Sequence, residues 1–339
     1  MKRSLCSIGV NLTGSRIISI VVIFLILLLS LINSNKYFES DLYVYSSQYQ
    51  QAVGSNLVVY LSVVGKDPLF YLMHFLFSNY ISINFRVYIF IFSIISYSGL
   101  TLFYSRFLRL LGVKSTLIGA CVVTMLFFPQ IFLYSGHVMR QFLALSWGYL
   151  GLVLLLYNRR LMGSLLLFSS ILTHSSSAII ILAFFLITEF STYWKALVLT
   201  LPLGFFLYPY FSSFLKGFER LNSLNSGAAE LEPAGVFSVG VVIVFLYLSV
   251  YWIKDKMIAK NFLFVPKMNI VLALIFFSFR FVGNHEVANR MMLGMFIIWP
   301  IILLYMLREF RATSLYKVII PILFLYLLRS VLNGPWTYL

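Results

Sequence analysis

Several ionisable side chains of this sequence stand at or near the ends of long apolar runs. Ionisable groups in or beside membrane segments are costly, so they are functional candidates by default. The histidines, arginines and carboxylates placed in this way are Asp41, Asp67, Arg86, His137, Arg140, His174, Arg280, His285, Glu286 and Arg290. Arginine offers phosphate a planar, permanently charged set of donors, and a histidine or carboxylate can accept a proton from a hydroxyl group. The combination indicates an anionic substrate, and pyrophosphate is the expected group.

Arg140 has the most informative local sequence of these candidates. It lies in Gly136-His137-Val138-Met139-Arg140-Gln141, directly before an apolar helix. The start of a helix offers backbone N–H groups and the positive end of the helix dipole, and both favour anions. We therefore expect Arg140 and Gln141 to contribute to substrate binding.

Each of the other functional candidates can also be explained by a purely structural role. Arg86 and Arg290 can be helix-end arginines whose side chains reach the membrane surface, and His74 is expected to be packed among its neighbours. Asp67, followed by a proline, suits a helix start. His174, followed by three serines, suits a polar turn. For Asp67 and His174 the catalytic and the structural interpretations stay open.

The composition indicates which elements must hold these residues. Hydrophobic residues make up 61% of the chain and charged residues 10%, with a mean hydropathy of +0.95. A soluble domain has roughly 25% charged residues, so this chain has too little polar surface for a soluble particle. Many apolar runs reach the roughly 20 residues that cross a bilayer as a helix. The sequence predicts an all-α, polytopic integral membrane protein with roughly 10–12 transmembrane helices, including short broken or re-entrant helices that face the periplasm.

The net charge of +15 does not indicate a nucleic-acid partner. Basic residues of membrane proteins gather in cytoplasmic loops and are attracted to anionic lipid. Cys6 and Cys121 are far apart and support neither a disulfide framework nor a thiolate metal site. The chain contains no Walker A sequence, no Gly-rich dinucleotide turn, no HExxH and no carboxylate cluster with metal-site spacing. We expect no metal and no cofactor, so the driving force must come with the substrate or from a gradient.

Two segments do not fit the simple pattern of spanning helices. The runs that can span are Ile17–Ile32, Arg86–Tyr104, Ser115–Tyr134, Gln141–Tyr157, Leu197–Phe211, Val236–Ile253, Asn269–Phe281, Met291–Leu307 and Val318–Leu332. Pro68–Tyr80 is too short to cross comfortably, whereas Leu161–Phe190 is too long for one span and is interrupted at residues 173–177. Irregular backbone at membrane depth is tolerated only beside protein or a wet cavity. Both segments therefore predict a cavity.

The basic loops give the chain its predicted orientation. All of them can lie in the cytoplasm if Pro68–Tyr80 does not cross and if Leu161–Phe190 enters and returns as two short helices. The N-terminus is then cytoplasmic, and the candidate side chains share the outer face. We treat residues 1–339 as one transmembrane domain with extracytoplasmic segments at 33–67 and 212–235. One missed short helix, which would invert part of this topology, is the alternative.

Four short stretches together resemble a known family. They are Asp41-Leu-Tyr-Val-Tyr, Asp67-Pro-Leu-Phe-Tyr-Leu, Arg140-Gln-Phe-Leu-Ala-Leu and Leu172-Thr-His174-Ser-Ser-Ser-Ala-Ile-Ile. Their order and spacing resemble the EpsG-like branch of the Wzy polysaccharide polymerases over roughly residues 37–190. Asn158-Arg159-Arg160 resembles a basic cytoplasmic turn of that family, and a serine follows His174 where the family more often has lysine. Further along the chain, Asn289-Arg290-Met291 is also similar.

The resemblance implies an enzyme that joins oligosaccharide repeat units at the periplasmic face of the bacterial inner membrane. The growing chain would be carried on undecaprenyl pyrophosphate and would become O-antigen, capsular polysaccharide or exopolysaccharide. The expected partners are this lipid-linked oligosaccharide and membrane lipid, together with a chain-length regulator as an open alternative. The sugar–phosphate bond would supply the driving force, and no metal is required if arginines stabilise the leaving pyrophosphate.

Each candidate residue then has an expected role. The pyrophosphate is assigned to Arg140 with Arg290 and Arg280; the base is His137 or His174; Asp41, Asp67 or Glu286 orients it or binds sugar hydroxyls; and Gln141 and Tyr43 add substrate contacts. The tyrosine cluster of Tyr43, Tyr45 and Tyr49 is open between an interfacial aromatic belt and a surface on which sugars stack.

Two other functional classes compete with this hypothesis. A transporter, such as a flippase for lipid-linked sugars, is expected to place its ionisable groups near the midplane and to show repeat symmetry. An O-antigen ligase uses the same lipid donor but transfers the chain once. The sequence separates the polymerase from the ligase poorly.

Overall fold

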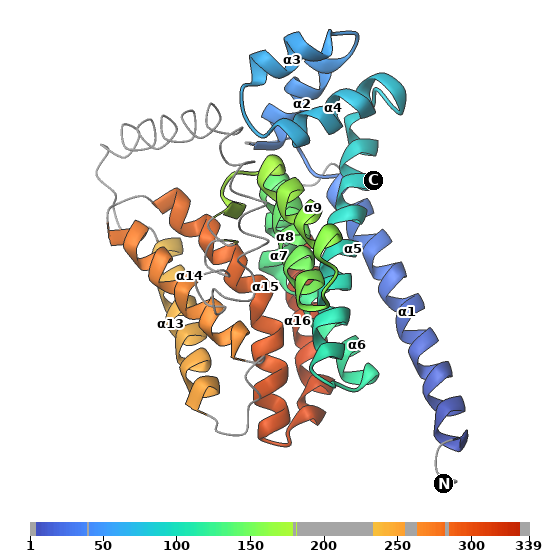
Figure 1. The fold of residues 1–339 in the computed structure, drawn as a ribbon, viewed down its shortest axis with the longest axis vertical. Coiled ribbons are helices and arrows are strands. Elements are labelled where there is room, and N and C mark those ends of the chain that lie inside the picture. Colours follow the sequence, from blue (N-terminus) through green and yellow to red (C-terminus); the bar gives the residue numbers. More distant parts are fainter. Residues whose placement is uncertain are drawn as a thin grey trace.

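The protein is a bundle of helices with a smaller helical cap at one end (Figure 1). The computed structural model describes residues 5–38, 41–178, 181, 233–254, 263–281 and 285–332. Within these ranges every regular element is a helix and no β-strand occurs. The predicted all-α class is therefore confirmed.

Among the described residues, five helical stretches are long and apolar enough to cross a membrane. They belong to α1 (Leu5–Ser34), α5 (Phe85–Leu110), α8 (Met139–Leu156), α15 (His285–Glu309) and α16 (Tyr316–Leu332) with the 3₁₀ turn before it. Three apolar helices are shorter in their described parts, namely α9 (Arg160–Thr173), α13 (Pro233–Lys254) and α14 (Phe264–Phe281). The chain is thus a multi-pass membrane protein. The predicted span Leu197–Phe211 and most of the predicted loop 212–235 lie outside the described residues, and α13 includes the last three positions of that loop.

The predicted span Ser115–Tyr134 is apolar enough to cross a membrane, but it is a bent pair of helices rather than one continuous helix. It is divided into α6 (Ser115–Leu126) and α7 (Pro129–His137), whose axes differ by 55°. Pro129 explains the break, because proline has no N–H for the helical ladder and its ring clashes with the preceding turn. Phe128 accordingly has extended backbone angles, φ −73° and ψ 111°.

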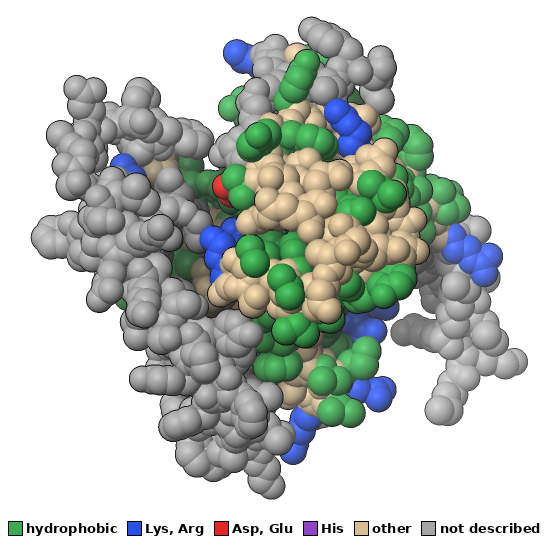
Figure 2. Space-filling model, turned by 90° about the horizontal axis from the view of Figure 1, so that it is seen from above, with side chains coloured by type: hydrophobic (Ala, Val, Ile, Leu, Met, Phe, Trp, Pro, Cys, Tyr) green, Lys and Arg blue, Asp and Glu red, His purple; other side chains and the backbone are tan. Residues whose placement is uncertain are grey.

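The cap consists of α2 (Asp41–Ala52), α3 (Leu57–Val64) and α4 (Pro68–Tyr80), which the chain forms between α1 and α5. Helix α4 has the bounds predicted for the short aromatic segment and lies across the end of the bundle (Figure 1). Seen from this side, the described surface is mainly hydrophobic or uncharged, with few charged side chains (Figure 2). Val58, Val59 and Val63 of α3 are 58–75% exposed. Such an exposed apolar face is typical of a helix at a membrane–water interface.

Aromatic rings form the core of the cap. His74 of α4 is fully buried and lies among the rings of Tyr49, Phe70 and Tyr88, with centroid distances of 5.5, 4.4 and 4.7 Å. Its two ring nitrogens make no hydrogen bond. Burial lowers the pKa of His74 well below its ordinary value, so the imidazole is neutral. His74 is packed, as expected from the sequence.

The basic turns gather at the end of the bundle opposite the cap, which we call the basic end (Figure 1). The hydroxyl group of Tyr157 donates to the carbonyl oxygen of Arg106 at 2.7 Å, which joins the α8–α9 turn to α5. The stacked rings of Tyr251 and Phe310, 5.8 Å apart, bring the end of α13 to the α15–α16 turn. The predicted gathering of basic loops on one side holds for the described residues.

Helices α8 and α9 approach closely because small residues face each other. A Cβ atom added at Gly163 would lie 2.9 Å from the carbonyl oxygen of Gly151 and 2.8 Å from Cδ2 of Leu155. The hydroxyl group of Ser170 donates to the carbonyl oxygen of Ala144 at 2.6 Å. Close backbone contact between small residues is a common basis of helix association in membranes.

Gly163→Ala is expected to destabilise the protein by about 1–3 kcal/mol, because the new methyl group meets the backbone oxygen of Gly151 as well as the side chain of Leu155, and the backbone cannot easily move away. Gly240→Ala in α13 is the matched control, since its added Cβ meets nothing within 4 Å. The control should be neutral or slightly stabilising, because alanine is the better helix former. Thermal unfolding of the purified proteins in detergent measures both. Equal midpoints for the two variants would show that the α8–α9 contact does not limit stability.

Candidate functional site

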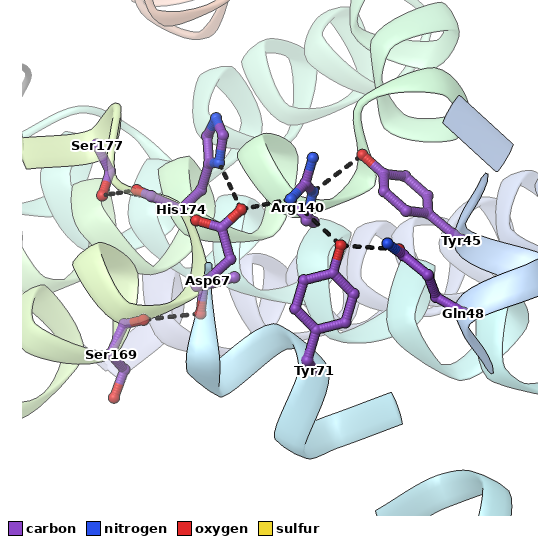
Figure 3. A network of polar contacts seen from close by, with 9 residues as sticks. Tyr45, Gln48, Asp67, Tyr71, Arg140, Ser169, His174 and Ser177 are labelled. Atoms are coloured by element: carbon purple, nitrogen blue, oxygen red, sulfur yellow. Dashed lines mark hydrogen bonds and ion pairs between the residues drawn. The ribbon is translucent and has the colours of Figure 1, made fainter. Parts of the chain in front are cut away.

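Three residues far apart in the sequence meet between the cap and the bundle (Figure 3). Arg140 Nη1 lies 2.5 Å from Asp67 Oδ2, and His174 Nδ1 lies 3.4 Å from the same oxygen. The three side chains are 11%, 5% and 8% exposed, respectively. Asp67 comes from the α3–α4 junction, Arg140 from the first turn of α8 and His174 from the end of α9. Charges this well buried are retained only with partners, so the three groups act as one unit.

Asp67 occupies the N-cap position of α4 but does not cap the helix. Its backbone is left-handed, with φ 49° and ψ 57°, and its side chain makes no capping hydrogen bond. The carboxylate points instead toward Arg140 and His174. Residues other than glycine pay a free-energy cost in this conformation, and such residues cluster at functional sites. Pro68 supplies the helix start that the sequence indicated, and the aspartate side chain faces the bundle.

The carboxyl group of Asp67 is ionised at neutral pH. Burial opposes the charge, but His174 and then Arg140 outweigh it and lower the pKa of Asp67 to about 2. The folded pKa lies below the unfolded value of 3.8. Asp67 therefore stabilises the fold above about pH 4, and this stabilisation is lost as the pH falls toward 2. Its charge does not change in the neutral range.

Tyrosines of the cap hold the guanidinium group of Arg140. Arg140 Nε donates to the hydroxyl oxygen of Tyr45 at 3.1 Å, and Nη1 lies 3.5 Å from the hydroxyl oxygen of Tyr71. The Tyr71 hydroxyl donates to Gln48 Oε1 at 2.8 Å. Burial raises the pKa of Tyr71 to about 12, so this donor keeps its proton. The guanidinium carbon also lies 5.1 Å from the ring centroid of Tyr45, within the range of a cation–π contact.

His174 stands where α9 ends, as the polar interruption at residues 173–177 predicted. Its backbone is extended, with φ −161° and ψ 118°, and its carbonyl oxygen accepts hydrogen bonds from the backbone N–H and the hydroxyl group of Ser177. Nδ1 faces Asp67, whereas Nε2 points away from it (Figure 3). A carboxylate at Nδ1 that orients a histidine base is a recurring catalytic arrangement.

Two other predicted site residues of the cap lie outside this unit. Asp41, at the start of α2, acts on Tyr45 through its charge. Tyr43 is 66% exposed and lies on the opposite face of α2 from the buried Tyr45. Gln141 is buried, with 2% exposure. The structure thus brings three of the predicted residues together and leaves Asp41 and Tyr43 beside them.

The remaining predicted residues are only partly described. The backbone of His137 ends α7, and its side chain and those of Glu286 and Arg290 lie outside the described residues. Arg280 stands in the last turn of α14. The ring of Phe264, at the start of α14, contacts Phe107 near the basic end. Arg280 therefore lies at the opposite end of its helix, the end nearer the cap.

Lys36 and two partners of the Arg140 network, Gln48 and Tyr71, were not selected from the sequence, and Tyr45 was named only within the tyrosine cluster of α2. The signal for Tyr45 was the helical spacing of Leu42, Tyr45, Tyr49 and Ala52, which are the buried side chains of α2. This stripe marks the face of α2 that is turned inward, and it separates Tyr45 from Tyr43.

Lys36, two residues beyond α1, is a second buried cation near the cap. It is 3% exposed, and its Nζ donates to the carbonyl oxygen of Phe132 at 3.3 Å and lies 4.3 Å from the ring centroid of that residue. A Cβ atom at Gly136 would lie 2.1 Å from this Nζ. Burial lowers the pKa of Lys36 from 10.5 to about 7. This amine therefore lies against the segment that leads to Arg140, and an anion bound nearby would favour its protonated form.

The described residues contain no group of three or more His, Cys, Asp or Glu side chains placed to hold a metal ion. No curated protein and no solved structure matches the chain. The model of the EpsG family matches residues 19–338. This match covers nearly the whole chain, well beyond the stretches that carried the resemblance. The chain belongs to the EpsG family, the family of Wzy-like polysaccharide polymerases.

Proposed function

We propose that this protein is a Wzy-type polymerase that joins undecaprenyl-pyrophosphate-linked oligosaccharide repeat units into O-antigen, capsular polysaccharide or exopolysaccharide. Family membership supports a polysaccharide polymerase-like role. The observation that carries the proposal is the buried unit of Asp67, Arg140 and His174 at the cap end of a membrane bundle. A lipid-anchored substrate requires a site that opens near the membrane surface, and this unit lies between the bundle and the interfacial cap.

His174 is the proposed base in this reaction. The hydroxyl oxygen of the acceptor sugar bonds to the anomeric carbon of the donor, and its proton passes to His174 Nε2. The bond from that carbon to the pyrophosphate oxygen breaks, and the pyrophosphate leaves with the electron pair. Asp67 orients the imidazole from Nδ1 and stabilises the cation that forms.

Positive side chains at the cap end are proposed to stabilise the leaving pyrophosphate. Arg140 supplies a permanent charge beside the first backbone N–H groups of α8. Asp67 offsets part of that charge, so we assign further cations to the same task, namely Lys36, Arg280 and Arg290. Fixed positive groups of this kind stabilise developing negative charge without a metal ion.

The orientation follows from the basic end. Arg106, Arg159, Arg160, Arg308 and Arg311 gather there, and such residues favour the cytoplasm. We propose that this end is cytoplasmic in the bacterial inner membrane, that the N-terminus lies there, and that the cap and its site face the periplasm. A transporter is disfavoured, because the buried ionisable unit lies at one end of the bundle rather than at mid-depth.

A reconstituted assay tests the proposal. Purified protein in liposomes is given undecaprenyl-pyrophosphate-linked repeat units isolated from a strain that lacks this protein, and the products are separated by size. We expect a ladder of chain lengths that is unchanged by EDTA. A single transfer would identify a ligase, and unchanged substrate that has crossed the bilayer would identify a flippase. Loss of the ladder with EDTA would overturn the role given to the cations.

A further inference from the structure

A hollow at the basic end combines three arginines with apolar walls. It lies among α5, α8 and α9 and has a volume of about 580 Å³. The arginines are Arg106, Arg159 and Arg160, and none of the described residues that line the hollow is a carboxylate. Two separate chain segments therefore place positive charge at the same hollow. Basic loops can orient a membrane protein without meeting in this way.

The walls of this hollow are fixed by the fold. The Tyr157 hydroxyl group donates to the carbonyl oxygen of Arg106 and so ties the α8–α9 turn to α5. Asn158 has a left-handed backbone, with φ 58°, which lets the chain reverse within a few residues. Arg159 and Arg160 then begin α9. The arginines accordingly stand on a tight, anchored turn.

The remaining lining of the hollow is apolar and partly exposed. Leu102 from α5 and Leu150 and Leu154 from α8 form its wall, with Leu161 and Met162 from α9. Leu161 and Met162 are 77% and 63% exposed. A ligand that matches both parts needs an anionic group for the arginines and a hydrocarbon chain for the leucines. Basic pockets between transmembrane helices recognise lipid headgroups in this way.

We propose that this hollow binds an anionic phospholipid of the adjoining leaflet. The lipid phosphate lies between Arg106 and the Arg159–Arg160 turn, where arginine can pair with it through two hydrogen bonds. An acyl chain covers the leucine wall. The site is at the opposite end of the bundle from Asp67, Arg140 and His174, so it is independent of the proposed polymerase reaction.

Lipid-dependent thermal unfolding tests this site. The delipidated protein in detergent is titrated with phosphatidylglycerol or with phosphatidylcholine of the same acyl chains, and separately with inorganic phosphate. We expect phosphatidylglycerol alone to raise the unfolding midpoint. Arg159→Ala/Arg160→Ala should weaken that response at least tenfold in lipid concentration, whereas Arg308→Ala/Arg311→Ala, in another basic turn, should leave it unchanged.

A second variant keeps the charges and fills the space. Leu102→Trp, at a position 47% exposed, should also remove the response to phosphatidylglycerol with all three arginines in place. Equal responses in the two double-arginine variants would show that the basic end attracts lipid only through its overall charge. An equal effect of phosphatidylcholine, an equal effect of inorganic phosphate, or a normal response in Leu102→Trp would each overturn the proposal.

Discussion

Arg140→Ala is expected to abolish polymer formation while the protein still inserts in the membrane. The substitution removes the permanent charge proposed to stabilise the leaving pyrophosphate and releases Asp67 from its 2.5 Å contact. Loss of one fixed donor to a developing anion typically lowers a rate by about 10²–10³. Polymer from cells that carry the variant is compared with wild type by gel ladder, at equal amounts of membrane-inserted protein.

Two comparisons separate this role from simple charge balance. Breaking a buried ion pair costs about 3–5 kcal/mol in stability, so Arg140→Ala alone is ambiguous. In an Asp67→Asn background no carboxylate needs a partner, and there Arg140→Ala should still lower polymer formation about 10²-fold. No further loss in that background would show that Arg140 serves only to balance Asp67. Arg86→Ala is the matched control, since Arg86 binds the carbonyl oxygen of Ser34 outside this unit and should leave chain lengths normal.

Hydrophobic patterning predicted most of the helices, because a membrane helix needs a long apolar run whatever its neighbours are. The bounds of Pro68–Tyr80 and the interruption at His174 also followed from the sequence. The same reasoning did not reveal the break at Pro129, where apolarity continues through a proline and the axes of α6 and α7 differ by 55°. Hydropathy reflects the free energy of moving side chains from water into lipid. One proline among apolar residues hardly changes the mean hydropathy of a span, although it breaks the helix.

The site was predictable in its charged members only. Asp67, Arg140 and His174 were candidates because ionisable groups are rare in apolar surroundings. Tyr71 was not a candidate, and Tyr45 was named only within a tyrosine cluster, because a tyrosine in such a chain is ordinarily an interfacial or core residue. Their contacts with Arg140 depend on how the cap lies on the bundle and on the left-handed backbone of Asp67. Such tertiary geometry has no local sequence signal.

His174→Asn has the second large expected effect. The asparagine amide can replace Nδ1 and keep a hydrogen bond to Asp67, but it has nothing in the place of Nε2. If Nε2 takes the proton of the acceptor hydroxyl, polymer formation should fall by about 10²–10⁴, the usual contribution of a general base. The thermal midpoint should stay near that of wild type. Initial rates with purified protein and lipid-linked repeats measure the first effect, and unfolding in detergent measures the second.

His174→Gln is the matched variant, because its longer side chain places an amide near the position of Nε2 and loses the contact with Asp67. A histidine that only holds Asp67 in place would be replaced well by asparagine and poorly by glutamine. A histidine that acts as the base would be replaced by neither, since an amide does not accept a proton at neutral pH. Substantial activity in His174→Asn would therefore remove His174 from catalysis and leave it a structural partner of Asp67. Inactivity of both variants, with His174→Asn as stable as wild type, separates the catalytic role from the structural one.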